Sequence, residues 1–165
     1  MKYYSGIGSR ETPEPILNIM HRIAIKMAQQ NVTLRSGHAV GADLAFEYGC
    51  GKGGGRKEIY WPYQATPEAM EMAAQFHPAW NNLQPYVKRL HGRNAFQILG
   101  LDLQTPSTCV VCWTKDGCTS HATRSIKTGG TGTAISIASH NQIPVYNLAN
   151  AKHLEIWETW LERPS

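Results

Sequence analysis

The sequence has no long hydrophobic run. In 165 residues, no apolar stretch approaches the roughly 20 residues that a membrane-spanning helix needs. The N-terminal segment MKYYSGIGSR also lacks the apolar core of a secretory signal. We therefore expect a soluble, cytoplasmic protein with no membrane partner. Internal repeats, low-complexity tracts and linkers are lacking as well, which predicts a single domain over residues 1–165.

Charged residues are sparse. They make up 17% of the chain, and the net charge is only +4, with a sequence pI of about 8.9. This excess is too small and too scattered to argue for nucleic acid by itself, although it suits anionic ligands. The hydrophobic fraction of 42% is ordinary for a globular protein and excludes wholesale disorder.

Cysteine is also rare, with four residues in the chain. Cys109 and Cys112 have the C-x-x-C spacing of many metal and redox sites. Both fall in the expected strand 109–113, where an offset of three places side chains on opposite faces, so the two thiols cannot easily share an ion. We therefore predict buried free thiols in a reducing compartment and no metal site. The sequence also gives no sign of a cofactor.

What the sequence does contain is a regular alternation of strands and helices. Strands are predicted at about 2–7, 32–36, 58–61, 109–113 and 144–148, helices at about 13–30, 42–48, 67–76 and 151–161 and from about 131, and a broken helical segment at 78–103. This alternation predicts an α/β domain with a largely parallel sheet. The pairs Thr12–Pro13 and Thr66–Pro67 predict helix starts, with threonine as the N-cap. The segment GCGKGGGRK, residues 49–57, resembles a P-loop only superficially and is predicted to be a flexible surface connection.

Three glycine-rich turns follow predicted strands. They contain Gly6 and Gly8, then Gly37 and Gly41, and finally Gly129, Gly130 and Gly132. In a parallel sheet the loops that follow the strands lie along one edge, so these turns should converge. A glycine turn that opens a helix leaves backbone N–H groups beside the positive end of the helix dipole, where phosphate commonly binds. Thr131 and Thr133 could add donors or cap the helix, and a plain loop is the alternative for each turn taken alone.

Six motifs, in order, make the sequence similar to a known superfamily. They are YSGIGSRETP, LRSGHAVGADLAFEYG, HGRNAFQILG, CVVCWT, GGTGTAISIA and IPVYNL, and they span roughly residues 3–148. Together they resemble the Rossmann-like SLOG superfamily, which includes the DNA-processing protein A of natural transformation, the cytokinin-activating LOG phosphoribohydrolases and nucleotide-signal sensors of bacterial immunity. The resemblance implies a three-layer domain, with helices on both faces of a mostly parallel sheet, in a small stand-alone bacterial or bacteriophage protein.

Two branches of the superfamily share these motifs. The DNA-processing pattern is GSR, then SG-x-A-x-G-x-D, then RNR, and the matching residues are Gly8, Ser9, Arg10, Ser36, Gly37, Ala39, Gly41, Asp43, Arg93 and Asn94. The last glycine turn resembles the LOG pattern PGG-x-GT-x-x-E, but Thr128 replaces its proline and Ser136 its glutamate. That glutamate acts with an arginine at the ribosyl bond in LOG enzymes. Arg93 could fill the arginine role, whereas Ser136 supplies no carboxylate, so we assign no catalytic residue.

The resemblance and the side-chain chemistry together give a predicted ligand site. Backbone donors of the second and third turns would bind phosphates, assisted by the forked guanidinium groups of Arg10 and Arg93. Asp43 could accept ribose hydroxyls or simply cap N–H groups at the start of its helix. His38 and His91 both lie near the expected mouth, and for each of them a surface or structural role is the alternative. The predicted binding residues are Gly8, Ser9, Arg10, Ser36, Gly37, His38, Gly41, Asp43, Arg93, Asn94, Thr114, Gly129, Gly130, Thr131, Gly132 and Thr133.

Four functions compete. The first is binding of a nucleotide or nucleotide-derived signal, such as a cyclic or ADP-ribose-type molecule, for sensing or for sequestration against a host signalling defence. The second is a nucleotide N-glycosidase or phosphoribohydrolase, in which Asp43 or Glu47 would supply the missing acid. The third is single-stranded DNA binding, and the fourth is a structural domain with a vestigial site. We favour the first, and we expect self-association, with Trp157 in the core and Trp160 available to a partner.

Overall fold

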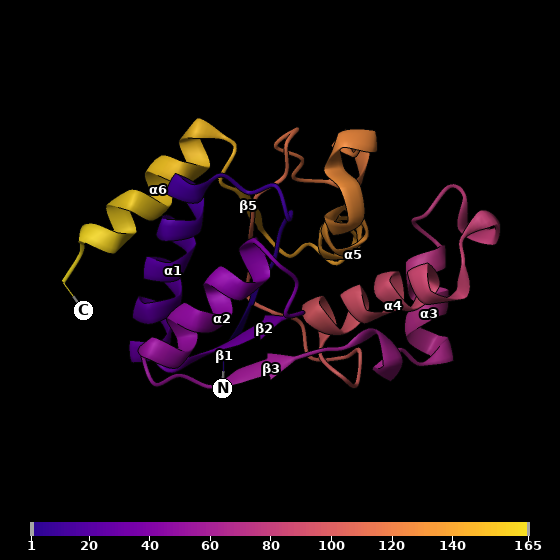
Figure 1. Ribbon diagram of the computed structural model, residues 1–165, viewed down its shortest axis with the longest axis horizontal. Coiled ribbons are helices and arrows are strands. Elements are labelled where there is room, and N and C mark those ends of the chain that lie inside the picture. Colours follow the sequence, from indigo (N-terminus) through magenta and orange to yellow (C-terminus); the bar gives the residue numbers. More distant parts are fainter. Residues whose placement is uncertain (1, 165) are drawn as a thin grey trace.

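A five-stranded parallel sheet runs through the molecule (Figure 1). The computed structural model describes residues 2–164. The strands are β1 (Lys2–Gly6), β2 (Val32–Ser36), β3 (Lys57–Ile59), β4 (Val110–Cys112) and β5 (Val145–Asn147). They lie in the order β3-β2-β1-β4-β5, and every neighbouring pair is parallel. The predicted α/β class with a parallel sheet is confirmed.

Helices cover both faces of this sheet. Within the described residues they are α1 (Glu14–Gln29), α2 (Ala42–Lys52), α3 (Pro67–Ala74), α4 (Pro85–Leu99), α5 (Gly132–His140) and α6 (Ala151–Glu162). Helices α1, α2 and α6 lie on one face and α3, α4 and α5 on the other, which gives the predicted three-layer arrangement (Figure 1). Short 3-10 turns are η1 (Pro62–Gln64), η2 (Trp80–Asn82), η3 (His121–Thr123) and η4 (Ile126–Thr131).

Each face of the sheet has its own hydrophobic core. Met20 of α1 packs with Phe46 of α2 on one face, while Phe96 of α4 packs with Ile135 of α5 on the other. All four side chains are fully buried, and burial of one such side chain contributes roughly 1.5–3 kcal/mol. The two cores therefore hold the sheet from both sides.

The cysteines follow the same division. Cys109 packs against the core on the α1 side and Cys112 belongs to the core on the α4 side, so the two C-x-x-C thiols lie on opposite faces, as predicted. All four cysteines are free. Burial raises the pKa of Cys109 to about 11, which keeps this thiol protonated and unreactive at neutral pH.

Glycine lets α2 lie close against α1. A Cβ at Gly49 would be 2.8 Å from the Cβ of Ala24, and a Cβ at Gly53 would be 2.7 Å from the carbonyl oxygen of Ile25. The segment 49–57 therefore forms the last turn of α2 and the approach to β3. The connection is therefore shorter than predicted, and two of its glycines serve close helix packing, whereas a Cβ at Gly51 or Gly54 would meet nothing within 4 Å. Flexibility of the remaining residues stays a prediction.

The predicted helix starts hold in part. Thr66 caps α3, since its hydroxyl accepts the N–H of Ala69 at 3.2 Å. Thr12 does not cap α1: the helix begins at Glu14, and the Thr12 hydroxyl donates to the carbonyl oxygen of Ser9 at 2.6 Å. All strands except β2 are also shorter than predicted at one or both ends.

The last helix packs on the α1 side of the molecule. Trp157 is buried in that core, as predicted. Trp160 is half-buried, with its ring edge-on to Trp157 at 5.1 Å and its face 4.6 Å from the ammonium group of Lys26. Self-association through Trp160 stays a prediction.

Between residues 2 and 164, every helix is too short or too polar to span a bilayer.

The chain changes direction across the sheet between β1 and β4. From β1 it moves outward through β2 to β3, and it then returns past β1 to β4 and β5. The loops that follow β1 and β4 therefore run to opposite sides and leave a crevice at the carboxyl ends of these strands. This crevice positions the site described next.

Candidate functional site

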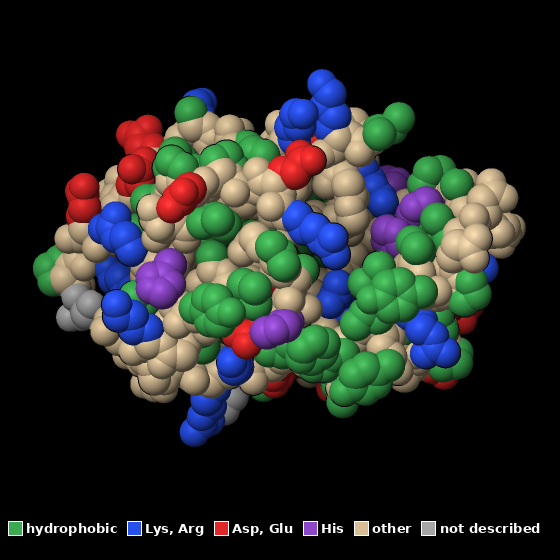
Figure 2. All heavy atoms as spheres, in the orientation of Figure 1, with side chains coloured by type: hydrophobic (Ala, Val, Ile, Leu, Met, Phe, Trp, Pro, Cys, Tyr) green, Lys and Arg blue, Asp and Glu red, His purple; other side chains and the backbone are tan. Residues whose placement is uncertain are grey.

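A cleft of about 1290 Å³ opens at the carboxyl ends of β1 and β4. Its walls are the loop after β1, the helix α4 and the 3-10 turn η4 that leads into α5. The hollow is visible to the right of centre in Figure 2, with Lys, Arg and His side chains around it. Its volume exceeds the roughly 300–1,000 Å³ of ordinary small-molecule pockets, so the cleft admits a large ligand.

The structure brings nine of the predicted site residues to this cleft. They are Gly8, Ser9, Arg10, Asp43, Arg93, Asn94, Gly129, Gly130 and Thr131. The first and third glycine turns line the cleft directly, and the second reaches it through Ala39 and Asp43. The three turns thus meet at one edge of the sheet. Binding by these residues stays a prediction.

Seven other predicted site residues do not line the cleft. They are Ser36, Gly37, His38, Gly41, Thr114, Gly132 and Thr133. Several of them support the surrounding loops instead. The Ser36 hydroxyl donates to the carbonyl oxygen of Gly6 at 2.6 Å. At Gly41, where φ is 98°, a Cβ would lie 2.7 Å from the carbonyl oxygen of Ser9, so glycine keeps the second turn against the first.

His38 lies in a separate cluster outside the cleft. Its Nδ1 is 2.7 Å from Oε1 of Glu47, and its ring packs on Trp61 with the centroids 5.1 Å apart. Lys57 binds the other oxygen of Glu47 at 2.9 Å. The alternative of a structural histidine is therefore the better description of His38. The cluster also holds Glu47 away from the cleft, which leaves Asp43 as the candidate acid.

Arg93 provides a buried positive charge at one end of the cleft. The residue is 9% exposed, and its Nη1 donates to the carbonyl oxygens of Gly37 at 3.0 Å and Tyr60 at 3.1 Å. A Cβ at Gly37 would lie 2.5 Å from Nη1, so this approach requires glycine. The Nε of Arg93 is buried and has no hydrogen-bond partner among residues 2–164. Burial lowers the pKa of Arg93, but a guanidinium stays charged in proteins.

Asp43 lies close enough to Arg93 for their charges to interact. Burial raises the pKa of Asp43 from 3.8 to about 6, although Arg93 and the backbone N–H groups of Ala39, Gly8 and Gly37 act in the opposite direction. Its Oδ2 accepts the Ala39 N–H at 3.3 Å. Asp43 therefore caps the loop before α2 and also gives the cleft a carboxyl group that titrates near neutral pH.

The third glycine turn faces open space. Gly129 has a φ of 67°, and a Cβ at Gly129 or Gly130 would meet nothing within 4 Å. Asn94 of α4 fixes the turn by donating from Nδ2 to the carbonyl oxygen of Gly130 at 3.0 Å. Thr131 makes no side-chain cap on α5, and the hydroxyl of Thr133 contacts α4 instead. Of the two roles considered for these threonines, the helix cap is therefore wrong.

The loop between β4 and the glycine turn is tied together by Asp116. Its carboxylate accepts the hydroxyls of Thr114 at 2.8 Å, Ser125 at 2.6 Å and Thr128 at 2.5 Å, and the backbone N–H of Cys118 at 3.2 Å. Although burial acts to raise it, these hydrogen bonds lower the pKa of Asp116 below its usual value. The carboxylate therefore stays charged and fixes the approach to the turn.

Beside the start of α5, the cleft is lined by residues that sequence reasoning missed as a group. Arg124, His91 and His121 line it. Arg124 donates from Nη1 to the carbonyl oxygen of Phe76 at 2.8 Å and from Nη2 to the hydroxyl of Thr133 at 3.1 Å. No spacing in the sequence signals this group, because His91 comes from α4, His121 from η3 and Arg124 from the link between η3 and η4, and they meet only in the folded chain.

Cations outnumber carboxylates around the cleft. Its lining includes Arg10, Arg93, Lys115, Arg124 and Lys127, together with Glu11 and Asp43. This excess favours anionic ligands.

In the part of the chain from residue 2 to 164, no group of three or more His, Cys, Asp or Glu side chains is placed to hold a metal ion. Comparison of the sequence with models of known protein families, with curated proteins and with solved structures found no match.

Proposed function

We propose that this protein binds a nucleotide or nucleotide-derived signalling molecule in the cleft. The observation that carries the proposal is Arg93, a guanidinium that lines the cleft, donates to the protein only through Nη1 and forms no salt bridge within residues 2–164. The charge of Asp43 interacts with it, but the pKa of that carboxyl group is raised, so the buried positive charge is incompletely balanced, which is costly. A phosphate of the ligand would complete the balance.

Other features of the cleft support the same class of ligand. The glycine turn at Gly129 and Gly130 offers unobstructed backbone N–H groups just before α5, which is a common way to bind phosphate. Arg10 adds a second guanidinium to the lining. The resemblance of six motifs to the SLOG superfamily supports a role in sensing or sequestration. From that resemblance we infer, more specifically, a protein that counters a nucleotide-signal defence of a bacterial host.

Cleavage of an N-glycosidic bond is the second candidate, and Asp43 is the observation that favours it. A carboxyl group with a pKa of about 6 lies in the cleft beside Arg93, and general acids work best when their pKa is near the operating pH. Ser136, at the position of the glutamate in LOG enzymes, is fully buried and supplies no carboxylate. Asp43 would therefore have to act alone as the acid.

Mass spectrometry of small molecules released by denaturing the purified protein tests the main proposal. We expect a phosphorylated nucleoside derivative to be released from the wild type and to be absent from Arg93→Ala. Isothermal titration calorimetry with AMP and ADP-ribose then measures affinity. Wild-type protein that releases no such molecule and binds neither probe would contradict the proposal.

Two further measurements separate the alternatives. Release of free adenine from AMP by the wild type, lost in Asp43→Asn, would indicate the N-glycosidase instead of a binding protein. Retention of a single-stranded oligonucleotide that falls steeply as salt rises would indicate the DNA-binding alternative, because several neutralised phosphates give such a dependence.

A further inference from the structure

Arg124 lines the cleft, yet most of its donors are committed to the protein. Nη1 donates to the carbonyl oxygen of Phe76 at 2.8 Å and to the hydroxyl of Ser136 at 3.3 Å, and Nη2 donates to the hydroxyl of Thr133 at 3.1 Å. Its Nε lies where a Cβ at Gly132 would be only 2.5 Å away. Three of the five N–H groups of the guanidinium are therefore committed to the protein.

The two hydroxyls connect Arg124 to two histidines. Thr133 and Ser136 are fully buried and lie three residues apart on α5. The Nδ1 of His91 is 2.8 Å from the Thr133 hydroxyl, and the Nδ1 of His121 is 2.8 Å from the Ser136 hydroxyl. Because a guanidinium only donates, each hydroxyl accepts from Arg124 and has its own proton available for the neighbouring Nδ1. Each imidazole then carries its proton on Nε2.

The Nε2 of His91 belongs to the cleft. The ring lines the cleft, and within residues 2–164 its only hydrogen bond is the one from Nδ1. Burial, and then the charges of His77, Arg124 and Arg93, lowers the pKa of His91 to about 4. The rings of His77 and Trp80 stand edge-on to it, with centroids 4.8 and 6.4 Å away. At pH 7 this wall therefore presents a neutral N–H donor among aromatic rings.

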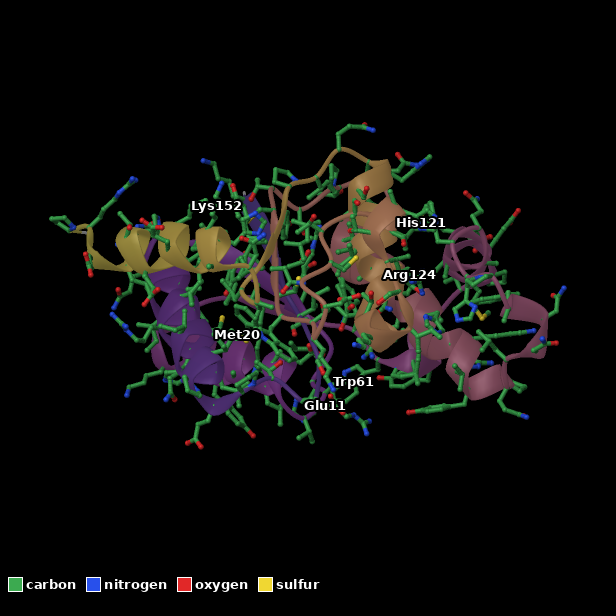
Figure 3. The ribbon with its side chains drawn as sticks, turned by 90° about the horizontal axis from the view of Figure 1, so that it is seen from above. Glu11, Met20, Trp61, His121, Arg124 and Lys152 are labelled. Carbon is green, nitrogen blue, oxygen red and sulfur yellow. The ribbon has the colours of Figure 1, made fainter. Side chains whose placement is uncertain are left out.

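We propose that this wall of the cleft, beside the start of α5, is the subsite for the nucleobase, with the Nε2–H groups of His91 and His121 as donors and Arg124 as a positioning residue. The assignment rests on the proposed nucleotide ligand. Neutral donors beside aromatic edges suit a flat, uncharged base, whereas phosphates are better bound by Arg93 and the glycine turn. Figure 3 shows His121 and Arg124 on the same side of α5.

The tautomers are tested on the ligand-free protein, so this measurement does not depend on the identity of the ligand. Long-range ¹H–¹⁵N spectra of protein labelled at histidine, assigned with His91→Gln and His121→Gln, report which ring nitrogen carries the proton. We expect both rings to be Nε2–H tautomers, and His91 to stay neutral down to about pH 5. An Nδ1–H tautomer, or a charged His91 at pH 6, would overturn the assignment of the two histidines as neutral Nε2–H donors.

Thr133 offers a matched pair of variants. In Thr133→Val the shape and the Arg124 charge remain but the hydroxyl is lost, so we expect a mixed tautomer at His91, while its pKa stays lowered by burial and by the neighbouring charges. In Thr133→Ser the hydroxyl remains, and we expect the wild-type spectrum. Identical spectra for the valine and serine variants would show that the hydroxyl does not set the tautomer.

Two probes then test recognition of the base. Wild-type protein should bind AMP more tightly than ribose 5-phosphate, and Thr133→Val should weaken AMP about tenfold, the equivalent of one hydrogen bond, while leaving ribose 5-phosphate unchanged. Equal weakening of both probes would place the phosphate, not the base, at this wall and overturn the subsite. Failure of both probes to bind the wild type would instead overturn the nucleotide function, whatever the spectra show.

Discussion

Two buried or half-buried arginines line the cleft, Arg93 and Arg124, and they make different contacts. Arg93 donates to two carbonyl oxygens but keeps a buried Nε without a partner, and its nearest carboxyl group, Asp43, has a raised pKa. Arg124 is committed to a carbonyl oxygen and two hydroxyls. Residue type and a place in the lining therefore do not fix the role of an arginine. Arg93 commits fewer N–H groups to the protein than Arg124 does, so we assign it the proposed phosphate contact and assign Arg124 a positioning role.

The largest effect is expected from substitution of Arg93. We expect Arg93→Ala to weaken binding of AMP by at least about 100-fold, because a charged hydrogen bond and its counter-charge are lost together. Calorimetry measures the affinity, and circular dichroism checks that the fold persists. Arg93→Lys, which keeps the charge without the planar fork, should recover part of the affinity. Wild-type affinity in the alanine variant would refute the role of Arg93.

Asp43 and His91 should affect the pH dependence of stability in opposite directions. The pKa of Asp43 is raised from 3.8 to about 6, so the folded state keeps a proton that the unfolded chain releases, and stability falls as the pH rises through that window. The pKa of His91 is lowered from 6.5 to about 4, so the unfolded chain takes up a proton that the folded state does not. Stability is therefore fully present above pH 6.5 and falls as the pH drops toward 4. Each effect amounts to about 3 kcal/mol.

These opposing contributions can be separated with two variants. Asp43→Asn should make stability rise more steeply between pH 4 and 6.5, and His91→Gln should make it fall with rising pH in the same window. Urea unfolding at half-unit pH steps measures both slopes. Parallel curves for the two variants would mean that neither group titrates as described.

Two glycines of the same turn give the next test. A side chain at Gly130 meets nothing within 4 Å, so Gly130→Asp should leave the melting temperature unchanged while its negative charge weakens AMP binding at least tenfold. Gly132→Ala brings a Cβ to 2.5 Å from the Nε of Arg124 and should cost about 1–3 kcal/mol of stability. Differential scanning fluorimetry distinguishes them, and a reversed pattern would mean that the turn faces the protein rather than the cleft.

The smallest effect is expected outside the cleft. His38→Ala removes a partly exposed partner of Glu47, so its cost in stability should be no more than about 0.5 kcal/mol. Binding of AMP should not change, because His38 does not line the cleft. A clear loss of affinity measured by calorimetry would restore His38 to the binding site.

The alternation of strands and helices was enough to predict the fold, because hydrophobic period and helix caps are local signals. The convergence of the glycine turns then followed from parallel topology. The start of the glycine-rich segment 49–57 was not recognised as helix, because the same residue serves loops and close helix packing, and only the contacts of Gly49 and Gly53 with α1 distinguish the two.

The lining of the cleft was predictable where a single sequence motif contains the residue concerned, as with Gly129, Gly130 and Arg93. It was not predictable where distant segments combine. His91 and Thr133 are 42 residues apart, and their hydrogen bond depends on α4 and α5 packing side by side. His38 shows the converse, since a residue inside a matching motif can belong to another cluster.

The hydrogen bonds of Asp116 have a kinetic consequence. They order the segment before the glycine turn in the absence of any ligand, so the conformational entropy of that segment, roughly 1–2 kcal/mol per residue, is lost during folding and not during binding. Capture would therefore require no loop closure. Its rate would be set by diffusion and by long-range attraction to the positive rim, and it should decline as ionic strength rises.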